Sequence, residues 1–260
     1  MRWRTMAWLC FLVLASLGCT VRHIREAQDS FNEAAGVENQ QRFDRAPRNG
    51  IRDLSSATAN YKLALAAVNA ELESNPSDLQ AENLLATALM LKALCLWRIA
   101  DLDNSDERGN EMGTVLKAID DLVAKKTLTL GTRDQVLLKA LPGLRDHDRG
   151  LRAKTLETAK PFFKSCFAVL DSALSDVKPP ENHPIWTYVR LAQLSTLIAW
   201  KDAVFRHRSD PNERRTEMAE PNASFDSSAL LLKPRWATDP SLYPAVVQLC
   251  KEMGRTPPPE

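Results

Sequence analysis

The pattern of hydrophobic and polar positions predicts helices along most of the chain. From Ser55 to Leu72 the apolar residues recur at spacings of three and four, which places them on one face of an α-helix. Similar stripes run over 112–123, 136–141 and 185–205. The strand-like alternation over 127–130 is too short to found a sheet. Glycine is also scarce, with nine in 260 residues, so we expect an all-α protein.

Proline, glycine and capping residues predict where these helices begin and end. A capping box pairs a Ser or Thr with a Gln three residues later, and such boxes are expected to begin two helices: Ser77 with Gln80, and Thr132 with Gln135. Proline disfavours the α conformation in the preceding residue and cannot donate to the helix ladder. Two motifs are therefore expected to end helices: Asn75-Pro76 and Pro142-Gly143.

Polar segments divide the chain into regions. The run over 208–224, which contains Pro211 and Pro221, predicts a loop. It would separate a helical domain over 19–207 from a C-terminal helical segment over 225–255. The proline-rich tail over 256–260 is expected to be disordered.

One stretch of the helical domain resembles a tetratricopeptide repeat. The resemblance rests on apolar, small and proline residues in the order and spacing of that family: Tyr61, Ala64, Leu65, Val68, Leu72 and Pro76, followed by Leu85, Ala86 and Leu89. A second copy is visible, because Tyr61–Leu72 aligns without gaps on Phe163–Leu174. The resemblance implies helical hairpins near 55–103 and 155–205, stacked as a solenoid. A generic α-helical bundle is the alternative.

The same resemblance implies a peptide-binding groove. Its inner positions would fall on four residues of the second helix: Gln80, Asn83, Thr87 and Met90. Polar side chains on an otherwise apolar helix suit peptide recognition. The alternative is that they form the narrow solvent-facing stripe of that helix.

The first eighteen residues have the organisation of a cleavable signal peptide. Arg2 and Arg4 form a positive region, and an apolar run of twelve residues extends from Met6 to Leu17. A membrane-spanning helix needs roughly 20 apolar residues, so this run is too short to cross a bilayer. We expect residues 1–18 to be removed on export.

The end of this segment resembles the lipobox of bacterial lipoproteins. Ser16-Leu17-Gly18-Cys19 places a small residue before a cysteine, although Ser16 stands where that family favours leucine. The resemblance implies that Cys19 receives diacylglycerol and an acyl chain such as palmitate. By the same resemblance, Thr20 favours the outer membrane, facing the periplasm, if the source is Gram-negative. An ordinary secretory signal that happens to contain a cysteine is the alternative.

Charge and cysteine content narrow the possible functions. Without Arg2 and Arg4 the mature chain has 32 basic and 33 acidic side chains, so it offers no general attraction for nucleic acid. Cys95, Cys166 and Cys250 lie among apolar residues and remain after processing. Their odd number argues against a disulfide framework within the chain and favours packing roles.

The sequence contains no recognisable catalytic or metal-binding constellation. The chain lacks a phosphate-binding glycine loop, a nucleophile elbow and a Cys-x-x-Cys pair. Asp146-His147-Asp148 is the nearest approach to a metal site, but adjacent residues on a helix do not face one point, and we interpret them as solvated turn residues. We therefore expect no metal, no cofactor and no enzymatic activity.

These observations predict a membrane-tethered scaffold of the cell envelope that binds proteins or peptides. The alternative is a periplasmic small-ligand binding component of a transporter-like system, which the chain is similar to only in its anchor and repeat type.

Overall fold

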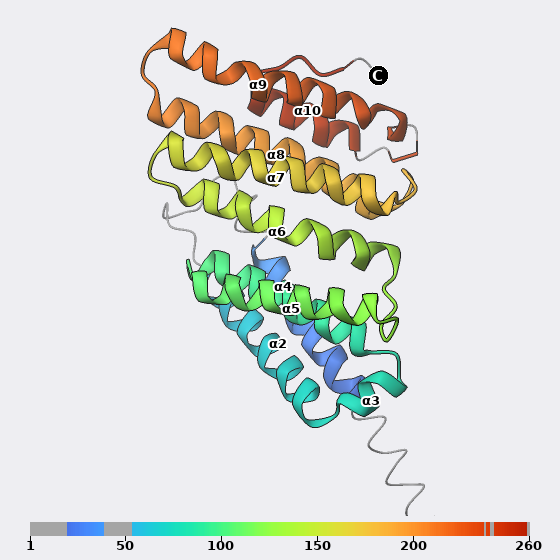
Figure 1. Ribbon diagram of the computed structural model, residues 1–260. Coiled ribbons are helices and arrows are strands. Elements are labelled where there is room, and N and C mark those ends of the chain that lie inside the picture. The colour runs from blue at the N-terminus through green and yellow to red at the C-terminus, as the bar shows by residue number, and fades with distance from the viewer. Residues whose placement is uncertain (1–19, 39–53, 237, 240–241, 259–260) are drawn as a thin grey trace, which may run out of the picture. The chain divides into compact units, whose positions relative to one another are not determined.

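The computed structural model describes residues 20–38, 54–236, 238–239 and 242–258. All regular structure in these residues is helical, which confirms the predicted all-α class (Figure 1). The chain divides into two compact units, 1–130 and 131–260. The expected repeat domain over 19–207 is therefore wrong as a single unit, because its helices contribute to two separate cores. The predicted signal peptide and Cys19 lie outside the described residues.

Unit 1 contains a helix over 20–38 followed by four labelled helices: α2 (Ser55–Ser74), α3 (Pro76–Ala81), α4 (Leu85–Leu102) and α5 (Asp106–Ala124). The predicted helices over 55–72 and 112–123 are confirmed as parts of α2 and α5. α2 packs on α4, and α4 packs on α5. α4 is the central element, since it buries residues around most of its circumference, among them Leu91, Cys95, Leu96 and Ile99.

The helix over 20–38 is attached to α2 along its length. Phe31 meets Tyr61 edge to face, with the ring centroids 5.1 Å apart. Nearer the start of this helix, His23 Nδ1 lies 2.5 Å from Glu71 Oε1. Glu71 stands where the tetratricopeptide pattern has a small residue, and here its carboxylate also accepts from Asn75 Nδ2 at 3.0 Å. The Glu71 carboxylate therefore connects α2 to the helix over 20–38 through His23.

The expected second helix of the first hairpin is interrupted, and the Ser77–Gln80 capping box does not begin α4. α3 starts at Pro76 and is only six residues long. Asn83 then adopts a left-handed φ of 57°, and Leu84 N donates to Leu79 O at 2.7 Å. This is a left-handed helix termination, which asparagine tolerates better than most residues.

Unit 2 contains α6 (Thr132–Arg152), α7 (Leu156–Val177), α8 (Pro184–His207), α9 (Pro211–Leu231), the short 3₁₀ helix η1 (Lys233–Arg235) and α10 (Leu242–Met253). α6, α7, α8 and α9 pack side by side in chain order, and α10 packs on α8 (Figure 1). α8 is the central layer, which explains why it is apolar on nearly every side.

α6 continues through Pro142-Gly143, so the predicted stop at this motif is wrong. Gly143 lies against α7, and a Cβ added there would be 3.0 Å from Val169 Cβ. Two turns later, a Cβ on Gly150 would lie 2.5 Å from the ring of Phe163. Both glycines therefore allow α6 and α7 to approach closely, and this packing offsets the poor helix propensity of the motif.

The prediction that Thr132 and Gln135 form a capping box is also wrong. Gly131 is the N-cap of α6 and makes no side-chain cap hydrogen bond, while Thr132 is already the first helical residue. A capping box elsewhere is formed by Thr155 and Thr158 at the start of α7.

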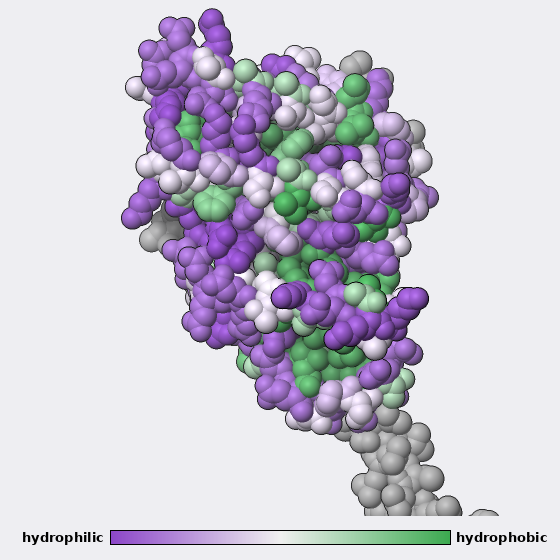
Figure 2. Space-filling model, in the orientation of Figure 1, coloured by the Kyte–Doolittle hydropathy of each residue, from purple (hydrophilic) through white to green (hydrophobic). Residues whose placement is uncertain are grey.

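The predicted loop over 208–224 is wrong, because α9 begins at Pro211. Asp210 is its N-cap and accepts from Asn212 N at 2.6 Å, while Pro211 occupies a position where proline is favoured. The buried residues of α9 follow helical spacing: Met218, Pro221, Phe225, Ser228 and Ala229. The outer face of its N-terminal half is hydrophilic, which explains why the composition was typical of a loop (Figure 2).

Several other boundaries match expectation. α8 covers the helix predicted over 185–205 and extends one residue before it and two residues after it. α10 lies within the predicted C-terminal helical segment, and Thr256–Pro258 has no regular structure. In the alignment of 61–72 with 163–174, Tyr61 and Phe163 are both buried, and so are Ala64 and Cys166. Among the described helices, none has the length and apolar character needed to span a membrane.

Candidate functional site

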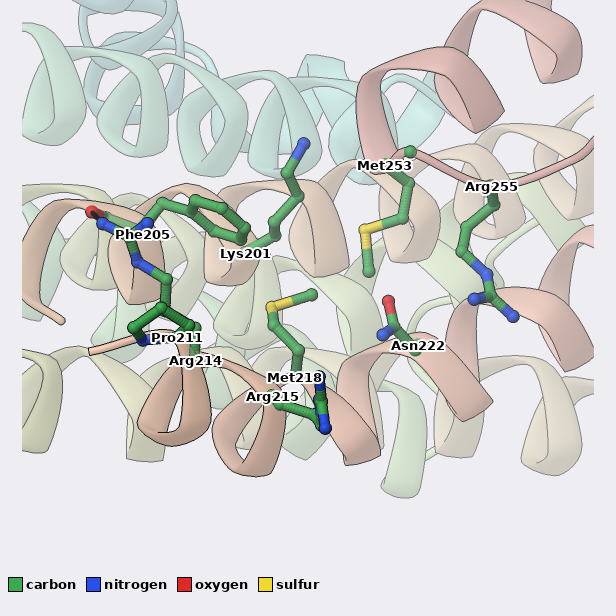
Figure 3. A pocket seen from close by; sticks show the side chains of 10 residues that line it. Lys201, Phe205, Pro211, Arg214, Arg215, Met218, Asn222, Met253 and Arg255 are labelled. Carbon is green, nitrogen blue, oxygen red and sulfur yellow. Dashed lines mark hydrogen bonds between the residues drawn. The ribbon is translucent and has the colours of Figure 1, made fainter. Parts of the chain in front are cut away.

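Unit 2 contains an open cleft where α8, α9 and the end of α10 meet. Its volume is about 380 Å³. We call it the basic cleft, and it is lined by Lys201, Phe205, Pro211, Arg214, Arg215, Met218, Asn222, Met253, Gly254 and Arg255 (Figure 3). These lining residues include four cations and no carboxylate.

The apolar surface of the basic cleft comes from Phe205 on α8, Pro211 and Met218 on α9, and Met253 on α10. Phe205 on α8 is 47% exposed, whereas Met218 on α9 and Met253 on α10 are largely buried. In Figure 3 the thioether ends of the two methionines point toward each other across the cleft. Methionine side chains adapt readily to different apolar partners.

Two cations lie over the ring of Phe205. The Arg214 guanidinium carbon lies 4.9 Å from the ring centroid, and Lys201 Nζ lies 5.8 Å from it. Arg214 Nε also donates to Arg208 O at 2.6 Å, at the C-terminal end of α8. Cations suit this end of a helix, where backbone carbonyls lack partners.

The opposite end of the basic cleft is formed by the turn that ends α10. Gly254 has a left-handed φ of 75°, which permits Arg255 N to donate back to Cys250 O at 2.8 Å. Arg255 Nε donates to Asp226 Oδ1 at 2.9 Å, and its Nη2 contacts Asp226 Oδ2. This pairing raises the pKa of Arg255 above its usual value. Lys201 Nζ donates to Glu252 O in the last turn of α10.

Arg215 differs from the other three cations. It is exposed, and no described residue accepts a hydrogen bond from its guanidinium or stacks on it. The neighbouring acids of α9 are engaged elsewhere: Glu217 binds Lys160 at 2.7 Å and Glu220 binds Lys164 at 2.6 Å. Arg215 therefore remains available to a ligand.

Unit 1 contains a separate polar cluster that is buried and has little access to solvent. The Arg98 guanidinium contacts both carboxylate oxygens of Glu38 and donates to Asp101 at 2.8 Å, and the Tyr61 hydroxyl donates to Glu38 at 2.9 Å. Glu38 and Arg98 are about 5% and 6% exposed, respectively. Burial and the Glu38 carboxylate raise the pKa of Tyr61. This cluster joins the helix over 20–38 to α2 and α4.

Asp146, His147 and Asp148 lie inside α6, so their interpretation as solvated turn residues is wrong. Asp146 accepts from Ser165 Oγ at 2.6 Å, and His147 Nδ1 lies 3.1 Å from Thr196 Oγ1. Asp148 is buried. The helix directs the three side chains to different neighbours, and no group of three potential ligands in the described chain is arranged to hold a metal ion.

The three described cysteines are buried, free thiols. Desolvation raises the pKa of Cys95 to about 12 and that of Cys166 to about 12, and it also raises the pKa of Cys250. Cys166 packs against Thr196, with 3.3 Å between Sγ and Oγ1. A thiolate is the reactive form of cysteine, so these neutral thiols are packing groups.

The four predicted groove residues do not lie along one helix. Gln80 belongs to α3 and Asn83 to the left-handed break, and both are exposed. Thr87 and Met90 belong to α4, where Met90 is only 3% exposed and turns into the core. The expectation of a continuous helical face is therefore wrong for this set.

Sequence reasoning missed the basic cleft because half of its lining lies in the segment assigned to a loop. A usable signal existed: Asp210-Pro211 is a helix start, and Met218, Pro221 and Phe225 follow at helical spacing. Comparison with protein-family models, curated proteins and solved structures gave no match to this chain.

Proposed function

We propose that this protein is an exported, lipid-anchored envelope protein whose helical body binds a partner protein through the basic cleft. The observation that carries the binding role is the cleft itself, which combines fixed cations with an exposed aromatic ring. Most of a small protein–protein interface is energetically near neutral, and a few aromatic and arginine residues dominate affinity. Phe205, Arg214 and Arg215 are residues of that kind.

The chemistry of the described chain also favours binding over turnover. The basic cleft presents positive charge and apolar surface, both of which select a ligand without activating it. The Glu38–Arg98 pair and the Cys166–Thr196 contact are enclosed by helices. Their physical role is to fix helix positions.

The anchor is tested by metabolic labelling with a fatty-acid analogue in cells that produce wild type, Cys19→Ala or Cys10→Ala. Cys10 provides a matched control, because it is a nearby cysteine that would be removed with the signal peptide, whereas Cys19 would remain on the mature chain. We expect label on wild type and Cys10→Ala only. Equal labelling of Cys19→Ala would refute lipid attachment at Cys19.

The binding role is tested by placing a photo-crosslinking amino acid at Asn222, in the basic cleft, and at Lys154, an exposed position of unit 2 outside it. Irradiation of intact cells should give discrete protein adducts from position 222 and not from position 154. The same adducts from both positions, or none from position 222, would contradict a partner-binding cleft.

One observation favours the alternative of a small-ligand binding component. The cleft volume of about 380 Å³ falls within the range of small-molecule pockets, roughly 300–1,000 Å³. In that case a competing low-molecular-weight anion, and not a protein, would occupy the cleft.

A further inference from the structure

We infer that the basic cleft recognises an acidic, extended segment of a protein in which an apolar side chain stands between carboxylates. This inference rests on the proposed partner-binding function and names the chemistry of the partner. It follows from the charge of the lining, from the way in which the cations are held, and from the apolar floor.

The charge argument comes first. Lys201, Arg214, Arg215 and Arg255 line the cleft, and Asp226 beside it offsets only one of these charges. A carboxylate is the natural partner, because an arginine fork matches its geometry and charge-assisted hydrogen bonds are stronger than neutral ones.

Three of these cations are fixed before any ligand arrives. Arg255 is held by Asp226, Lys201 by Glu252 O, and Arg214 by Arg208 O. A guanidinium has five N–H donors, so Arg214 and Arg255 retain donors after making these bonds. Preorganised donors lose little conformational entropy on binding, which raises affinity for a ligand that reaches them.

The apolar floor distinguishes a peptide from a simple anion. In Figure 3, Phe205 lies at one end of the cleft near Lys201 and Arg214, Arg255 lies at the other end, and Met218 and Met253 lie between them. An apolar side chain placed against Phe205 and Met218 would bury the exposed ring of Phe205. Flanking carboxylates would then reach Arg214 or Arg215 on one side and Arg255 on the other. Free phosphate would use only the charges.

The test uses the purified full chain in a non-ionic detergent and a fluorescent peptide, Gly-Ser-Glu-Leu-Glu-Ser-Gly with an amidated end, measured by fluorescence anisotropy. Charge-assisted pairing predicts that the Gln-Leu-Gln version binds at least about tenfold more weakly. Loss of the apolar contact predicts that the Glu-Ser-Glu version binds about fivefold more weakly or worse.

The protein variants isolate Arg215, which has no described partner and whose replacement should leave the fold intact. Reversal of its charge in Arg215→Glu should weaken binding about tenfold, and Arg215→Lys should stay within about threefold of wild type. Lys154→Glu makes the same change in net charge outside the cleft and should alter affinity less than about twofold. Circular dichroism of each variant verifies folding.

The possible failures are distinguishable. Equal affinity for the Glu-Leu-Glu and Gln-Leu-Gln peptides, or equal effects of Arg215→Glu and Lys154→Glu, would overturn the inference. Binding of octanoate or inorganic phosphate without binding of the peptide would also overturn it and would favour the small-ligand alternative. Protein adducts from position 222 together with no peptide binding would leave the partner-binding function standing and would reject only the acidic segment.

Discussion

At the scale of single residues, glycines set how closely two helices pack. Gly143 and Gly150 lie seven positions apart on the face of α6 that meets α7, where added Cβ atoms would meet Val169 and Phe163. A Cβ added to Gly113 on α5 would have no neighbouring atom within 4 Å. The same residue type therefore has opposite consequences at positions 150 and 113.

Gly150→Ala should destabilise the protein by about 1–3 kcal/mol, because the new methyl group overlaps the buried Phe163 ring and this outweighs the roughly 1 kcal/mol gain in helix propensity. Gly113→Ala should instead stabilise it by up to about 1 kcal/mol. Urea unfolding followed by circular dichroism measures both. A stabilising Gly150→Ala would show that α6 and α7 are not in close contact there.

The buried ion pair between Arg98 and Glu38 in unit 1 should contribute to the free energy of unfolding. Arg98→Leu should cost about 3–5 kcal/mol, because it leaves the Glu38 carboxylate buried without its main cation. Adding Glu38→Gln should restore part of that loss, so the double variant should be more stable than additivity predicts. A double-mutant cycle by urea unfolding measures the coupling, and an additive result would argue against the pair.

Because Cys95 and Cys166 are buried thiols, we expect the folded protein to lose stability at high pH. Burial raises the pKa of Cys95 and of Cys166 to about 12, whereas a thiol in the unfolded chain titrates near 8.5. The folded state therefore holds protons that the unfolded state releases, and stability falls as pH rises from about 8.5 toward 12, by up to about 1.4 kcal/mol per pH unit for each thiol.

Replacing both cysteines by alanine should flatten this decline between pH 8.5 and 10, although the double variant is less stable at neutral pH. The measurement is the midpoint of urea unfolding across that pH range. Parallel curves for wild type and the variant would show that the thiols do not titrate differently in the two states.

At the scale of elements, α9 depends on its start. Asp210 accepts from Asn212 N and Glu213 N, and the helix that follows supplies five residues of the basic cleft. The N-terminal half of α9 is mostly polar, and Met218 is its buried apolar residue. Because this half has little apolar packing, the Asp210 cap should contribute to the stability of the helix.

Asp210→Ala should destabilise unit 2 by about 1 kcal/mol, and Asp210→Asn should retain most of the stability, because asparagine caps nearly as well. Ser209→Ala, at the exposed neighbouring position, should have little effect. Thermal unfolding compares the three variants. Equal stability of Asp210→Ala and wild type would mean that α9 forms without its cap.

At the scale of the whole molecule, each unit has a core of its own. The buried residues of unit 1 centre on α4, and those of unit 2 centre on α8. Domains with separate cores are able to fold alone. The chain 131–260 expressed by itself should therefore be helical and unfold cooperatively, and it should bind the Glu-Leu-Glu peptide as the full chain does. A fragment without a cooperative thermal transition would contradict this division.

The sequence predicted the helices better than it predicted the ends of the helices or the candidate site. Apolar spacing predicted α2, α5, α8 and part of α6, because an amphipathic stripe is a local property of the chain. The ends of helices were less well predicted. Pro142-Gly143 and Pro211 were assigned as breakers, yet the first packs within α6 and the second begins α9.

By itself, the sequence determined the all-helical class and the apolar stripes that contain buried residues such as Tyr61 and Phe163, since both follow from periodicity along one segment. Only the tertiary structure decided the basic cleft and the division into two units. Lys201, Arg215 and Arg255 come from three separate segments, and their meeting depends on which helices pack together. That choice is made by long-range burial and close approach, which no local pattern of residues encodes.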